Sequence, residues 1–173
     1  MKNTVLRYGI RSALSIFVLF LISSLLLKNL DFDTQEIYGY ASIIVSLLFV
    51  FFGIKHFRDK ENNGLLSFGK GLIIGLLITL FASVAFGLYN VIYVEYIDPN
   101  FMSEYYNHSV EQISKTLSGE ELQAKLKKMK EEKEMFSKPI MNFSLMFLTV
   151  FMIGLIISLI SSLVLSKKSP QTN

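Results

Sequence analysis

Four long stretches of this chain carry almost no charge, and nearly all of its charged residues lie between them. The stretches are residues 5–27, 37–54, 71–94 and 140–166, and only Arg7 and Arg11 interrupt the first. A helix needs about 20 mostly apolar residues to cross the hydrocarbon core of a bilayer, and it satisfies its own backbone hydrogen bonds there. The pattern therefore predicts an all-α membrane protein with four transmembrane helices, built as a single integral membrane domain over residues 1–173.

The spans contain no ionisable residue near their middle, where such a group would mark a functional site. There are no cysteines, which excludes disulfides, thiol catalysis and thiolate metal sites. No Gly-rich phosphate loop, metalloprotease helix motif or serine-nucleophile elbow occurs. We therefore expect no catalytic residue, no cofactor and no metal site, and we do not expect an enzyme.

Lys and Arg residues near the span ends predict the orientation. Nine lie on the N-terminal side of the membrane and eight on the other side, of which seven belong to residues 95–138. The first span usually dominates, and Lys2, Arg7 and Arg11 precede most of its apolar run. This favours cytoplasmic N- and C-termini.

The insert at residues 95–138 is predicted to form an extramembrane amphipathic helical hairpin between the third and fourth spans. Its apolar residues recur at helical spacing, and Ser118 with Glu121 matches a capping box at the start of the second helix. The candidate face for a partner protein comprises Tyr106, Leu122, Leu126 and Met129. Two alternatives remain open, namely a solvated hairpin without any ligand and a hairpin that lies on the lipid surface.

Small residues recur every four positions along the third span, and the fourth span repeats the pattern. Such residues let two membrane helices approach closely. The alternatives are packing within one bundle, a seam between two copies of the chain, and a substrate path. The residues concerned are Gly71, Gly75, Thr79, Ser83, Gly87, Gly154, Ser158 and Ser162.

Two further pairs of polar residues suggest structural roles. Asn90 and Asn142, near the outer ends of the third and fourth spans, are predicted to hydrogen-bond to each other. His56 and His108 fall in separate extramembrane segments, so they cannot share a metal ion within one chain.

Four short motifs carry a resemblance to a known family: residues 53–59 (GIKHFRD), 63–64 (NG), 67–71 (SFGKG) and 96–101 (YIDPNF). Their order, together with four spans and the insert, resembles family 4199 of the domains of unknown function, small membrane proteins of Bacteroidetes-type bacteria. The resemblance covers nearly the whole chain. It implies a bacterial inner-membrane location and a periplasmic hairpin, and it carries over no catalytic residue.

The loop between the second and third spans has a structural interpretation, in which Arg58 and Asp59 cap the inner ends of those two spans and Gly64 and Gly69 shape the turn. The alternative is that its basic residues bind a lipid head group or a cytosolic partner. The residues of that candidate contact are Lys55, Arg58, Lys60 and Lys70.

The sequence thus favours a non-enzymatic scaffold or accessory subunit that presents the hairpin. The alternative is a small-solute or lipid transporter acting as an oligomer. The expected partners are the lipid bilayer, a membrane or periplasmic protein, and a second copy of the chain. Nucleic acid is not expected, because no basic cluster interleaves with aromatic residues in a soluble unit.

Overall fold

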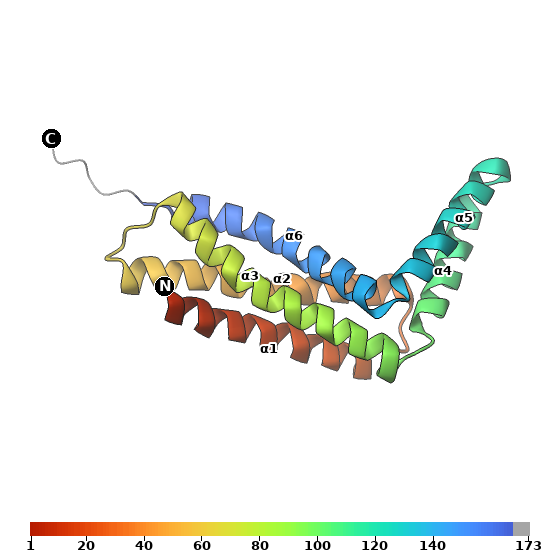
Figure 1. The fold of residues 1–173 in the computed structure, drawn as a ribbon, viewed down its shortest axis with the longest axis horizontal. Coiled ribbons are helices and arrows are strands. Elements are labelled where there is room, and N and C mark those ends of the chain that lie inside the picture. Colours follow the sequence, from red (N-terminus) through yellow and green to blue (C-terminus); the bar gives the residue numbers. More distant parts are fainter. Residues whose placement is uncertain (168–173) are drawn as a thin grey trace. The chain divides into compact units, whose positions relative to one another are not determined.

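Helices account for nearly all of residues 1–167, the part of the chain that this computed structural model describes (Figure 1). In chain order they are α1 (Lys2–Leu26), α2 (Phe32–His56), the π-helical turn η1 (Phe57–Glu61), α3 (Phe68–Ile92), the π-helical turn η2 (Tyr93–Ile97), α4 (Phe101–Thr116), α5 (Gly119–Phe136) and α6 (Pro139–Leu165). The predicted all-helical class is confirmed. Four helical segments, α1, α2 with η1, α3 with η2, and α6, are long and apolar enough to cross a membrane.

α2 and the combined α3–η2 segment extend beyond their predicted spans at both ends, whereas α1 and α6 begin before theirs and each end one residue short of them. α2 shows why, since it begins at Phe32 rather than at residue 37. The carboxylate of Asp31 accepts hydrogen bonds from the backbone N–H of Thr34 at 2.9 Å and from its hydroxyl at 2.8 Å. This N-cap satisfies an otherwise free amide, so the helix starts before the apolar residues do.

The chain divides into two units, and the first comprises residues 1–86 and 147–167. Its core is a column of fully buried aliphatic side chains that includes Ile16, Leu47, Ile54, Ile74 and Val150. α1 and α2 are also joined by two hydrogen bonds, one buried and one partly buried. The hydroxyl of Ser12 donates to the carbonyl of Ser46 at 2.7 Å, and the Ser46 hydroxyl donates to that of Ser15 at 3.3 Å.

The loop between α2 and α3 closes against the C-terminal end of α6 within this first unit. Leu66 and Lys167 exchange two backbone hydrogen bonds, 2.9 and 2.8 Å long. Arg58 donates from Nη1 to the carbonyl of Leu165 at 3.4 Å. These contacts satisfy carbonyls that a helix C-terminus leaves free. The prediction that Arg58 caps the second and third spans was therefore wrong in its target, because the loop folds back far enough to reach the fourth.

The second unit comprises residues 87–146. Within it α4 and α5 run side by side (Figure 1), and the ammonium of Lys133 lies 4.9 Å from the centre of the Tyr106 ring. Ser118 does occupy the N-cap of α5, but its side chain makes no capping hydrogen bond. The predicted capping box is therefore wrong. Gly119, the first residue of α5, has a φ of +61°, so the helix begins with a left-handed residue instead of the helical backbone that a capping box requires.

The predicted hydrogen bond between Asn90 and Asn142 is also absent. Asn142 is only 2% exposed, and neither polar atom of its side chain has a hydrogen-bond partner. The reason lies in the register of the helices. A methyl group added at Gly87 would lie 2.7 Å from the Phe143 ring, so Phe143 is the residue of α6 that packs directly on α3 at this level.

Gly64 offers a direct test of the closing loop. Its φ is +78°, a conformation that costs a residue with a Cβ about 1 kcal/mol or more. Gly64→Ala should therefore lower the free energy of unfolding in detergent micelles by about 1 kcal/mol.

The matched control is Gly69→Ala. Gly69 lies inside α3 and an added methyl would meet nothing within 4 Å, so alanine there should be neutral or stabilising because of its higher helix propensity. Equal losses in the two variants would contradict a specific role for the turn.

Candidate functional site

The small residues of α3 and α6 face one another within the first unit. Ser162 lies over Gly71, where an added methyl group would be 3.0 Å from its Oγ. Ser158 lies over Gly75, where the corresponding distance is 2.6 Å. Gly154 lies against Thr79 in the same way. We call these six residues the α3–α6 seam. Side chains of the same chain leave no free space in the seam, because one added methyl group would force the two helices apart.

The last two predicted positions on α3 serve different neighbours. Ser83 is fully buried and its hydroxyl donates to the carbonyl of Thr79 at 3.0 Å. Gly87 belongs to the second unit and faces the Phe143 ring. The four-residue repeat on α3 is therefore one continuous helix face, but its members do not share a single contact.

Three hydroxyls of the seam are buried without a hydrogen-bond partner, namely those of Thr79, Ser158 and Ser162. Each has a relative exposure of 0%. An unsatisfied buried hydroxyl costs about 1–3 kcal/mol. Close van der Waals contact with the opposing glycines offsets that cost, so the seam is a tight but polar-lined helix interface.

We predict that Gly75→Ala lowers the free energy of unfolding by about 1–3 kcal/mol, as expected for overpacking. Steric contact with Ser158 is the cause, so the loss should shrink by about 1 kcal/mol when Ser158→Gly is combined with it in a double-mutant cycle. Unfolding can be followed by circular dichroism in mild detergent. Strictly additive effects of the two substitutions would contradict the direct contact.

The basic loop residues do not form one cluster of equivalent cations. Arg58 is only 21% exposed and pairs with Asp59, Nε to Oδ1, at 2.6 Å, in addition to its bond to α6. Lys70 lies over the ring of Phe57, with 5.1 Å between its Nζ and the ring centre. Lys55 and Lys60 are exposed. Arg58 thus has a structural role here, and the three lysines present charge at the surface.

The predicted partner face of the hairpin is half-buried. Tyr106 on α4 and Leu122, Leu126 and Met129 on α5 are all of intermediate exposure, and neither α4 nor α5 contains a fully buried residue. The charged residues lie outside. Lys115 pairs with Glu111 at 2.8 Å, and this hydrogen bond lowers the pKa of Glu111 below its ordinary value. The apolar stripes of two helices are thus only partly covered.

An open groove beside α1 was missed from the sequence. Its volume is about 490 Å³, and its lining comprises Arg11, Leu14, Ser15, Val18, Leu19 and Phe49. The available signal was Arg11 followed by apolar residues three and seven positions later, which places a cation and an apolar strip on one helix face. That pattern alone does not predict a groove, because the opposite wall is formed by Phe49 of α2.

Metal-binding side chains do not converge in the part of the chain described here. No group of three or more His, Asp or Glu residues within residues 1–167 has the geometry to hold a metal ion.

The four helices that are long and apolar enough to cross a membrane, together with the small-residue seam, indicate that the chain is a helical membrane protein. The chain belongs to the family described as "Protein of unknown function (DUF4199)", whose model matches residues 7–167. The family resemblance deduced from the motifs is thus confirmed over nearly the whole chain. Comparisons with curated proteins and with solved structures gave no match.

Proposed function

We propose that this protein is a non-enzymatic scaffold or accessory subunit of a bacterial inner membrane. In this proposal the termini and the α2–α3 loop lie in the cytoplasm, and the α4–α5 hairpin stands in the periplasm as the surface for a membrane or periplasmic partner protein. The observation that carries it is the contrast between the uncharged spans and the heavily charged hairpin.

The charge of α5 supports its position outside the hydrocarbon core. Residues 125–134 include eight Lys or Glu residues. Each would cost about 2.5 kcal/mol or more at the bilayer centre, so together they would cost about 20 kcal/mol. One exposed ion pair on this helix, Lys128 with Glu132 at 3.7 Å, offsets little of that penalty.

The half-buried apolar stripes support a partner. Two helices packed only on each other leave Leu122, Leu126 and Met129 partly exposed to water. Covering that apolar area would add favourable burial energy of about 25 cal/mol per Å². A protein surface of matching shape gains this energy when it docks, whereas a solvated hairpin does not.

Cysteine labelling tests the topology cleanly, because the native chain has no cysteine. In intact spheroplasts, a membrane-impermeant maleimide should label Lys128→Cys on the hairpin and should label Lys60→Cys only after permeabilisation. Leu148→Cys, at 53% exposure on an apolar face of α6, is the control, and it should react in neither condition if that face meets lipid. The reverse pattern for the first two would place the hairpin in the cytoplasm.

Site-specific photo-crosslinking tests the partner. A photoreactive amino acid at Leu122 or Lys128 should give a discrete protein adduct in living cells. The same residue at Leu148 should give lipid adducts only. Hairpin positions that yield only lipid or self adducts would contradict the scaffold proposal.

The second candidate is a small-solute or lipid transporter acting as an oligomer. The observation in its favour is the set of buried, unpartnered hydroxyls on Thr79, Ser158 and Ser162. The helices are in direct contact at these groups, so transport requires α3 and α6 to separate. Flux into proteoliposomes that is present in the native protein and lost in Gly75→Val would favour this function, and absence of flux in the native protein would rule it out.

A further inference from the structure

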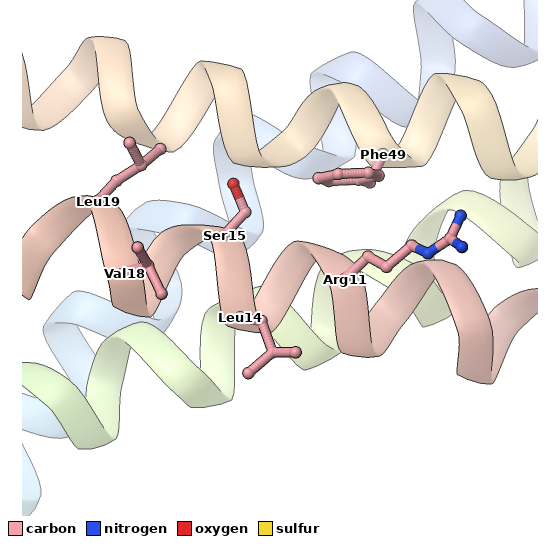
Figure 2. A pocket seen from close by; sticks show the side chains of 6 residues that line it. All are labelled: Arg11, Leu14, Ser15, Val18, Leu19 and Phe49. Carbon is pink, nitrogen blue, oxygen red and sulfur yellow. The ribbon is translucent and has the colours of Figure 1, made fainter.

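The groove beside α1 combines an apolar wall with one cation at its end. Leu14 and Val18 are 59% and 47% exposed, and they line the groove with Leu19 of α1 and Phe49 of α2. Figure 2 shows the Arg11 side chain extending from this wall toward the N-terminal end of α1, while Phe49 reaches in from α2. The volume of about 490 Å³ lies within the range of about 300–1,000 Å³ that is usual for small-molecule sites.

Arg11 has no acidic partner among residues 1–167. Its guanidinium lies 5.4 Å from the centre of the Tyr8 ring, and that of Arg7 lies 6.0 Å from the same ring. His56 also packs on Tyr8, with 5.6 Å between the ring centres. The guanidinium of Arg11 therefore lies beside an aromatic ring rather than a carboxylate, and its positive charge at the end of the groove is not compensated by an ion pair.

The length of α1 places this charge at the edge of the hydrocarbon core. Residues 12–27 form its uncharged run, which is about 24 Å long at 1.5 Å per residue. That is shorter than the core, which is about 30 Å thick. The core must therefore extend close to Arg11. The long side chain can carry its guanidinium toward the head groups, and in Figure 2 it extends toward the N-terminal end of α1.

We propose that this groove is a binding site for one anionic phospholipid. The phosphate pairs with the guanidinium of Arg11, a geometry in which arginine forms two parallel hydrogen bonds. One acyl chain lies along Leu14, Val18 and Leu19 and against Phe49. An anionic lipid is favoured over a zwitterionic one because the guanidinium of Arg11 gives the end of the groove a positive charge, and a choline or ethanolamine group would add a further cation.

This inference shares with the proposed function only the insertion of α1 and α2 into a bilayer. It concerns different residues from the basic loop and does not depend on a hairpin partner. The cysteine labelling described above reports insertion by itself. A correctly inserted protein that fails to retain the lipid would therefore overturn only the lipid site.

The test is native mass spectrometry of the full-length protein from micelles containing equal amounts of phosphatidylglycerol and phosphatidylcholine with identical acyl chains. The native chain should retain one phosphatidylglycerol in preference to phosphatidylcholine. Arg11→Gln should reduce that retention about tenfold, the size of effect expected when a charge-assisted hydrogen-bonded pair is lost. Arg7→Gln is the matched control. It removes the same charge from the same helix outside the groove lining, and it should change retention less than twofold.

A second variant tests the acyl path while leaving the charge in place. Val18→Trp puts a large ring into the groove from an exposed position, and it should also reduce retention several-fold. Circular dichroism checks that each variant keeps its helices. Equal retention of the two lipids by the native chain, equal losses in Arg11→Gln and Arg7→Gln, or full retention in Val18→Trp would each overturn the proposed site.

Discussion

The close contact of α3 with α6 is the constraint on which the span bundle depends. Half of the most apolar window of α3 is buried, against 17% in α1 and in α6, so α3 is the helix that the others cover. Water cannot drive apolar helices together inside a bilayer, so close packing has to provide the association energy. Glycines opposite serines supply it here, because an added methyl at Gly75 would come within 2.6 Å of the Ser158 Oγ.

Because the α3–α6 seam contains few hydrogen bonds between the two helices, hydrogen bonds elsewhere are needed to hold α6 in place. A glycine-lined contact gives closeness but few directional bonds, and three of its hydroxyls have no partner. Directional bonds are instead concentrated at the loop before α3, where Leu66 pairs with Lys167 and Arg58 reaches Leu165. These hydrogen bonds fix the position of α6 along its axis. The van der Waals contacts of the seam are not directional, so they restrain that position less strongly. The seam and the closing loop therefore have complementary tasks.

The spans could be predicted from the sequence because charge is costly in lipid and its absence is visible residue by residue. The repeat on α3 was visible for a similar reason, since a four-residue period marks one helix face. The sequence did not show which partners those faces meet. Arg58 was assigned to the wrong helix because its carbonyl partner lies 107 residues away in the chain. Asn90 and Asn142 lie at similar depth in the sequence pattern, but the rotation of each helix decides whether two side chains meet, and the side chain of Asn142 has no hydrogen-bond partner. The capping box was predicted from residue types alone, and the left-handed φ of Gly119 at the first helical position cannot be read from its neighbours.

The apolar stripe on α4 and α5 and the groove along α1 are both partly uncovered, but they differ in the ligand that would cover them. On α4 and α5 the apolar stripe is half-covered and is flanked by charges of both signs, such as Lys115 with Glu111 and Lys128 with Glu132. A partner for that surface therefore has to cover the half-buried apolar side chains and accommodate charges of both signs beside them. Along α1 the apolar wall is open and its single cation is unpaired, so the occupant needs an anion attached to a hydrocarbon chain. An anionic phospholipid meets that requirement from within the bilayer, whereas the occupant proposed for the hairpin is a protein, so the two proposed sites involve different residues and different ligands.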